Sequence, residues 1–357
     1  MSEKIILTLT VDWEGASLKQ ENLDAMKAFQ KKFPDYPVTH FICPAYYTRG
    51  EDPVPITEKI KSVLKPSDEI GLHIHCWYTL MDLFAKRHIT TPTWLPDNDP
   101  GDGVPYDGGT KMDYGHDVPL GLYTVEEITA TLIGGRQLLA TNGLIGSTAD
   151  CPSFRCGGWM ACDKVFEALG KAEFKNDASG APASFNLWVY QWIQTNWSVS
   201  YPLFLWLYQI WGTNYMSSPD FLVNSKSRAA YPRGVLGLRD LDISPPALID
   251  GIVEVPDTGS LADYNSRDNL KQYIDTAVDA PTDEVYISLG FHQETATDKS
   301  VFDPPSTNIE ILTWGLEYLQ SVTQQVEVLT RRDAAERFQA SQAKARERAG
   351  EVRRLAA

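Results

Sequence analysis

The sequence predicts an α/β fold built from parallel βα units. Short apolar segments recur along the chain, and several are followed by a stretch with helical periodicity. Strands separated by helices run parallel, because the helix returns the chain to the edge where the previous strand began. The length of 357 residues is within the range of one α/β barrel, and 43% hydrophobic residues supply its core. Polar residues gather at the ends of three segments, as they do at the rim of a barrel.

The strands and helices can be assigned in chain order. Strands are predicted at residues 4–11, 37–43, 69–76, 153–156, 252–255 and 285–291, and helices at 18–33 and 124–140. Thr124 is the predicted N-cap of the second helix, because Glu127 three residues on completes a capping box. Asn142-Gly143 is a stop signal for the same helix.

Two segments are too long for ordinary connections. Residues 80–121 are rich in Pro, Gly and Asp, and residues 180–245 are rich in Trp and Tyr. Long loops on a rigid scaffold often carry binding function. We therefore expect one barrel domain over residues 1–331 that contains both loops, followed by a helical or flexible tail over residues 332–357.

Charge and composition exclude several classes of protein. A net charge of −15 argues against nucleic-acid binding, which needs clustered Lys and Arg. The five cysteines show no CxxC spacing, so we expect reduced thiols and neither a disulfide framework nor a thiolate zinc site. The sequence shows no secretory signal and no uninterrupted apolar run of about 18 residues, which predicts a cytoplasmic protein without a membrane span.

Three predicted strands share one design, in which an apolar face alternates with a polar face that ends in reactive side chains. The first strand leads to Asp12 and, by the same period of two, to Glu14. The second ends in His73 and His75, and the last in His292. One such residue is ordinary. Coincidence over three strands indicates a site, because imidazoles and carboxylates are the usual metal ligands and proton carriers.

The segment Thr10-Val11-Asp12-Trp13-Glu14-Gly15 resembles the first motif of the polysaccharide deacetylase (NodB-homology) family, carbohydrate esterase family four. The resemblance extends from residue 8 to about residue 332. It implies an incomplete or distorted (β/α)7 barrel. It also implies that Asp12 is the catalytic base and Glu14 a metal ligand, in a variant where one residue separates the two acids.

The second motif of the family resembles Glu69-Ile70-Gly71-Leu72-His73-Ile74-His75. The common pattern places the second histidine four residues after the first, where this chain has Trp77. Residues two apart on a strand point the same way, so His75 can stand beside His73 as a ligand. His116, in the first long loop, is its rival for the third coordination position.

Three later segments complete the resemblance. In Phe154-Arg155-Cys156-Gly157-Gly158-Trp159 the family's arginine contacts the base, and a guanidinium at salt-bridge distance lowers a carboxylate pKa. Residues 174–179, which include Asp177, resemble the family's next strand end. Leu289-Gly290-Phe291-His292 resembles the motif whose histidine is the general acid. The resemblance thus implies Arg155 and His292 as catalytic residues beside Asp12.

Several side chains near predicted strand ends are candidates for substrate contact. They are Tyr46, Trp77, His116, Trp159 and Asp177, with Tyr47 beside the first of them. Asp113 and Asp117 form a polar cluster with His116, and a solvated loop is the alternative interpretation of that cluster.

The second long loop holds many tryptophans. Stacking on sugar rings and burial in a core are both open for them, and core is favoured because aromatic side chains bury much surface. They are Trp188, Trp192, Trp197, Trp206 and Trp211. His40 and His88 have no motif partner and are predicted to be structural or exposed.

The resemblance implies a metal-dependent hydrolase that removes an N-acetyl or related acyl group from a carbohydrate, a reaction at a C–N bond other than a peptide bond. Zinc is the expected ion, because two neutral imidazoles and one carboxylate leave positions open for water and the acyl oxygen. Two alternatives stay open: an amidohydrolase acting on a small cyclic amide or another non-sugar substrate, and a non-catalytic sugar-binding relative. The oligomeric state is open as well.

Overall fold

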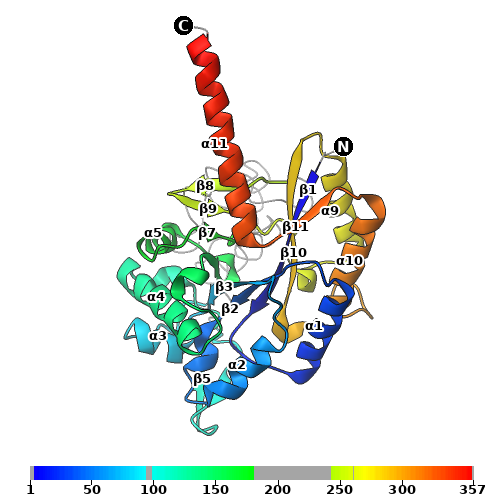
Figure 1. The fold of residues 1–357 in the computed structure, drawn as a ribbon. Helices are drawn as coiled ribbons and strands as arrows, with labels where there is room; N and C mark the ends of the chain where they lie inside the picture. Colours follow the sequence, from blue (N-terminus) through cyan, green and yellow to red (C-terminus); the bar gives the residue numbers. More distant parts are fainter. Residues whose placement is uncertain (1–3, 94–98, 181–242, 260, 356–357) are drawn as a thin grey trace, which may run out of the picture.

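The computed structural model describes residues 4–93, 99–180, 243–259 and 261–355, which form an incomplete α/β barrel (Figure 1). Within these residues, nine strands make one sheet in the order β10-β1-β2-β3-β6-β7-β9-β8, and β11 also pairs with β1. All of these pairings are parallel except that of β8 with β9. The predicted fold class is therefore confirmed.

The strands of the sheet are short except for two. Their bounds are β1 Lys4–Trp13, β2 Thr39–Ile42, β3 Glu69–Ile74, β6 Ser153–Cys156, β7 Asn176–Asp177, β8 Ala247–Ile249, β9 Ile252–Glu254, β10 Glu284–His292 and β11 Val326–Leu329. The helices surround them and are α1 Gln20–Lys32, α2 Pro53–Lys61, α3 Tyr78–Phe84, α4 Val125–Thr141, α5 Asp163–Lys171, α9 Arg267–Asp279, α10 Asn308–Val322 and α11 Arg331–Leu355.

Strand β1 is the centre of the sheet. It pairs with β10 along one edge, and along the other edge with β11 over its first half and β2 over its second half. A parallel strand that is covered on both faces is expected to be nearly all apolar. Apart from Lys4 at its start, the exceptions are Thr8, Thr10 and Asp12, which are buried and alternate along the strand, so they form one row that faces the interior of the barrel.

The curled sheet nearly closes where the segment that follows β9 contacts strand β10. The Gly259 amide donates to the Ser288 carbonyl oxygen at 3.0 Å, and Leu261 forms a parallel bridge with Gly290. A side chain at position 259 would collide with that carbonyl oxygen, so only glycine permits this approach. The curled sheet thus brings the ends of β1, β3 and β10 to one rim.

The predicted elements agree with most of the structure, and the first long loop is more ordered than expected. Thr124 and Glu127 form the predicted capping box at the start of α4. Residues 80–121 hold the end of α3, a 3-10 turn (Leu120–Leu122) and a hairpin of β4 (Val104–Tyr106) with β5 (Lys111–Asp113). The predicted tryptophan-rich segment lies almost wholly outside the described residues.

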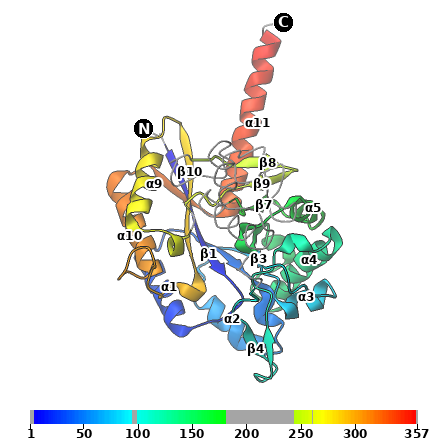
Figure 2. The same ribbon diagram turned by 180° about the vertical axis from the view of Figure 1, so that it is seen from behind.

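Helix α11 begins inside the molecule and ends outside it. Arg331, Ala334 and Ala335 are buried, and the two alanines pack with Ile6 and Val253 of the sheet. The rest of the helix projects away from the barrel in both views (Figures 1 and 2). Among the described helices, none has the length and apolar character needed to cross a membrane.

Candidate active site

The rim of the barrel brings together five of the residues that the sequence singles out. Asp12 and His292 are directly opposite one another in the register of β1 and β10. Glu14 follows β1 and lies with its carboxylate 3.3 Å from His73 Nε2 and 2.5 Å from His75 Nε2. His292 Nε2 is 3.6 Å from the same carboxylate. Side chains at the ends of β3 and β10 therefore converge on Glu14, which follows β1.

The two histidines at the end of β3 carry the geometry of a metal site. His73 Nδ1 donates to the Arg155 carbonyl oxygen at 2.9 Å, and His75 Nδ1 donates to the His116 carbonyl oxygen at 2.8 Å. In the neutral rings each Nε2 then presents a lone pair. These two nitrogens are only 3.1 Å apart. Two lone pairs at that distance repel unless a cation lies between them.

A divalent ion fits this donor set. Ligand atoms of Glu14, His73 and His75 all lie within 4.8 Å of one another, as do those of Asp12, Glu14 and His292. Two ligand atoms bound to one tetrahedral ion are about 3.3 Å apart, given bonds of about 2.0–2.1 Å. The two nitrogens come close to this spacing, whereas the 2.5 Å between His75 Nε2 and the Glu14 carboxylate would have to widen when an ion binds. Burial lowers the pKa of His75 to about 4, which keeps that ring neutral and available as a ligand. The backbone carbonyls that fix both rings supply the supporting hydrogen bonds typical of metal-bound histidine.

His116 also reaches the site. Its Nε2 lies 2.6 Å from Glu14 and its Nδ1 2.9 Å from Asp117, while its ring stacks on His75 with centroids 3.9 Å apart. Burial lowers the pKa of His116, but the hydrogen bonds to Asp117 and Glu14 outweigh this and raise it to about 10. The pKa values of His75 and His116 thus shift in opposite directions, although both rings contact the same carboxylate.

Asp12 is held by Arg155 as the sequence suggests, although burial also affects its pKa. Arg155 Nη1 donates to Asp12 Oδ1 at 2.7 Å, and both side chains are buried. Burial raises the pKa of Asp12 and outweighs the lowering by Arg155, His73 and His292. Arg155 thus lowers the pKa of Asp12 as expected, but desolvation of the fully enclosed carboxylate is the larger effect and sets the net direction.

His292 has an acidic partner that the sequence did not reveal. Asp263, in the 3-10 turn Ala262–Tyr264, lies 3.3 Å from His292 Nδ1 and accepts the His292 backbone amide at 3.1 Å. Burial lowers the pKa of His292, but Asp263, Glu14 and Asp12 together raise it to about 10. Asp263 lies on no strand and in no recognised motif, so alternation along strands could not identify it.

The predicted substrate contacts other than His116 are mostly enclosed. The Trp77 indole is 1% exposed and donates to the Glu14 carbonyl oxygen at 2.8 Å, so it fixes the chain at Glu14. Tyr46 is buried and donates to Glu294 at 2.5 Å. Asp177 is fully buried and accepts the Ser179 amide and hydroxyl. In this structure these three side chains support their neighbours.

Trp159 is the predicted contact nearest to His292. Its ring lies edge-on to the His292 ring, with centroids 6.5 Å apart, and is 9% exposed. Its Nε1 donates to Asp257 at 3.1 Å, which fixes the indole in place. Trp159 therefore lies on the His292 side of the site.

The remaining predicted polar residues have structural partners. His40 is buried between Trp13 and Asp68, and His88 lies at the surface beside Asp82. Asp113 is fully buried and binds Arg49 and Thr79, so it belongs to the support of the first long loop. The five cysteines are buried and free; they are Cys43, Cys76, Cys151, Cys156 and Cys162.

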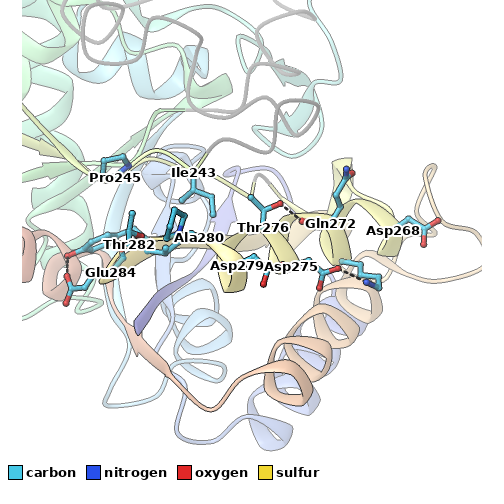
Figure 3. Close-up of a pocket in the computed structure, with 14 residues that line it drawn as sticks. Ile243, Pro245, Asp268, Gln272, Asp275, Thr276, Asp279, Ala280, Thr282 and Glu284 are labelled. Carbon is cyan, nitrogen blue, oxygen red and sulfur yellow. Dashed lines mark hydrogen bonds and ion pairs between the residues drawn. The ribbon is translucent and has the colours of Figure 1, made fainter. Parts of the chain in front are cut away.

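One cavity among the described residues lies away from these groups. It has a volume of about 960 Å³ and lies along α9 and the start of β10 (Figure 3). Its acidic side chains include Asp275, which pairs with Lys271, and Glu284, which accepts from Tyr286. A smaller cavity of about 410 Å³ is lined by Tyr46 and the residues just after Gly15. None of the convergent residues lines either cavity.

Comparison with known proteins gives similarity of fold only. No protein-family profile matches the chain. No curated protein matches it either. A solved structure from Mycobacterium smegmatis, assigned as a polysaccharide deacetylase, is 11% identical with a TM-score of 0.48 over 96% of this chain and 92% of that one.

Two further solved structures show weaker similarity. A family 4 carbohydrate esterase from Streptomyces lividans, in complex with acetate, is 8% identical with a TM-score of 0.38 over 91% of this chain and 92% of that one. A 4-alpha-glucanotransferase from Thermococcus litoralis is 10% identical with a TM-score of 0.42 over 94% of this chain and 40% of that one. At these levels of similarity, the function has to be inferred from the site itself.

Proposed function

We propose that this chain is a metal-dependent hydrolase that removes an N-acetyl or related acyl group from a carbohydrate. The observation that carries the proposal is the pair of His73 and His75 Nε2 atoms, 3.1 Å apart and both directed at Glu14. Such a set of two imidazoles and one carboxylate would hold a zinc ion with open coordination positions. A bound ion of this kind would lower the pKa of a water molecule and polarise an acyl oxygen.

The two groups beside the metal ligands suit opposite proton transfers. Asp12 would accept a proton from the attacking water, and Arg155 holds its carboxylate in place at 2.7 Å. His292 would donate a proton to the departing amine, and Asp263 holds the ring through Nδ1, which leaves Nε2 to face the site. A raised His292 pKa keeps that proton available at neutral pH.

The choice between substrate classes calls for a direct assay. The zinc-loaded chain should release acetate from N-acetylglucosamine oligomers, whereas an amidohydrolase would open a cyclic amide such as hydantoin without releasing acetate. A non-catalytic sugar-binding relative would do neither, and the presence of both Asp12 and His292 at the site argues against it. Absence of turnover on every probe, with about one zinc bound per chain, would contradict the proposal.

Replacing His292 with glutamine is expected to lower kcat by about 100-fold and leave KM within about threefold. Glutamine keeps a similar size and loses the transferable proton. Asp263→Asn should show a smaller loss in the same direction, because it removes the charge that favours protonated His292. Steady-state kinetics on the acetylated oligomer would measure both. Wild-type turnover in His292→Gln would exclude this residue as the acid.

His75→Ala is expected to weaken zinc binding by more than about 100-fold, and His116→Ala by less than about tenfold. Both rings contact Glu14, but His75 Nε2 also faces His73 Nε2, whereas His116 is stacked on His75 and is hydrogen-bonded through Nδ1 to Asp117. Competition titration with a zinc chelator would measure both variants. The reverse order would assign the third ligand position to His116.

A further inference from the structure

One buried carboxylate, Asp257, connects the candidate site to the last helix of the chain. It lies between two arginines, and all three side chains are fully buried. Arg155 Nη2 is 3.4 Å from one Asp257 oxygen, and Arg331 Nη2 is 3.2 Å from the other. Together with Asp12, these groups form a row of alternating charge: Asp12, Arg155, Asp257 and Arg331. The four charges cancel within the row.

We propose that Asp257 is a positioning residue that orients Arg155, and through it the proton acceptor Asp12. This inference rests on the proposed function, since it concerns how the hydrolytic site is held in place. Asp257 is distant from Asp12 in sequence and lies on no strand, so the ion pairs of the folded chain are what identify it.

The contacts of Arg155 show why a second anchor is needed. Its Nη1 donates to Asp12 and Thr10, and its Nε donates to the Ala178 carbonyl oxygen at 3.2 Å. Its Nη2 is buried and makes no hydrogen bond in the described structure, and the Asp257 charge is what faces it. With a neutral group at position 257, the guanidinium loses the force that balances Asp12. The carboxylate would then no longer be held in one orientation.

Asp257 also fixes the opposite side of the site. The same oxygen that faces Arg155 accepts the Trp159 indole at 3.1 Å, and Trp159 lies edge-on to His292. The other oxygen accepts the Ser288 hydroxyl at 2.6 Å from strand β10. One carboxylate therefore links the environments of the proton acceptor and the proton donor.

Arg331 makes the burial of Asp257 tolerable. It donates from Nη1 to the Val255 and Pro256 carbonyl oxygens at 2.6 and 3.1 Å, and from Nη2 to Ser288. Without Arg331, Asp257 would face only Arg155, whose charge is already shared with Asp12. A buried charge that is not fully paired is destabilising. The first residue of α11 is thus part of the support of the site.

The test compares Asp257→Asn with a matched control, Asp68→Asn, in the zinc-loaded full chain. Asp68 is also a buried carboxylate, but it pairs with His40 and lies at the start of β3, far along the strand from the site. Hydrolysis of 4-nitrophenyl acetate is the probe. We expect kcat to fall by about 10- to 100-fold in Asp257→Asn, with KM and zinc content unchanged. Asp68→Asn should lose stability and keep kcat within about threefold.

A second pair of variants protects the test against misfolding. Asp257→Asn combined with Arg331→Gln removes one charge of each sign, and we expect it to fold and to show the same loss of kcat. Arg155→Lys should also lower kcat, and adding Asp257→Asn to it should lower kcat little further, because both changes act through one contact. Multiplying effects, or a kcat loss equal to that of Asp68→Asn, would overturn the proposal. No hydrolysis of either 4-nitrophenyl acetate or the acetylated oligomer by the zinc-loaded wild-type chain would instead contradict the proposed function.

Discussion

Replacing Asp12 with asparagine is expected to lower kcat by about 1,000-fold or more while the chain keeps its metal. Asparagine fills the same space and still accepts a hydrogen bond from Arg155, but it cannot take a proton from water. Glu14, His73 and His75 remain unchanged, so the metal ligands stay in place. Steady-state kinetics on the acetylated oligomer and elemental analysis for zinc would measure the two effects separately.

Measuring kcat and zinc content separately lets the Asp12→Asn variant distinguish a proton acceptor from a metal ligand. Loss of both metal and turnover would mean that Asp12 is a ligand, which the second donor group of Asp12, Glu14 and His292 makes a concrete rival. Retention of more than about a tenth of wild-type turnover would show that another group accepts the proton. Asp68→Asn is the control for the removal of a buried carboxylate.

Replacing Glu14 with alanine is expected to abolish both metal binding and turnover. Glu14 is the only residue shared by the two donor groups found in the described part of the chain, and its carboxylate contacts His73, His75 and His116. Without it the site has no anionic ligand, and zinc content should fall from about one ion per chain to below about 0.1. Zinc analysis after dialysis against excess chelator-free buffer would measure this.

The control for the Glu14 variant is His88→Ala. His88 lies at the surface beside Asp82, so its loss removes a potential adventitious zinc ligand and nothing from the site. Full zinc content in Glu14→Ala would refute the ligand assignment. His73→Ala should behave as Glu14→Ala does, since its Nε2 faces both other ligands of the set.

Alternation along strands was enough to predict that five residues of the candidate site, Asp12, Glu14, His73, His75 and His292, lie at strand ends. Polar residues two apart at the end of a strand point to the same face, so the pattern gives both their position and the direction of their side chains. Glu14, His73 and His75 could therefore be placed on one rim. Trp77 stands where the family's common pattern has its second histidine, but in this chain that position lies beyond the strand. Strand β3 ends at Ile74, and Trp77 already caps α3 and turns its indole towards the Glu14 backbone.

Two further residues, Asp263 and Asp257, could not be predicted, because their positions depend on turns and on distant chain segments. Asp263 reaches His292 from a 3-10 turn, and Asp257 reaches Arg155 from the segment after β9. Neither position follows a periodic pattern. The sequence indicates that Arg155 lowers the pKa of Asp12, but the net direction also depends on how completely the folded chain removes water from the carboxylate.

The position of β1 in the sheet has a consequence for how this protein folds. Residue pairs such as Lys4 with Glu284 and Ile5 with Val326 join positions about 280 and 320 apart in the chain. Contacts between such distant residues form slowly, because the entropy cost of closing a long loop comes before the contacts stabilise the chain. During synthesis, β1 cannot form these pairings until β10 and β11 have been made. The side-chain cluster of Asp12 and His292 can therefore form only after β10 has been synthesised.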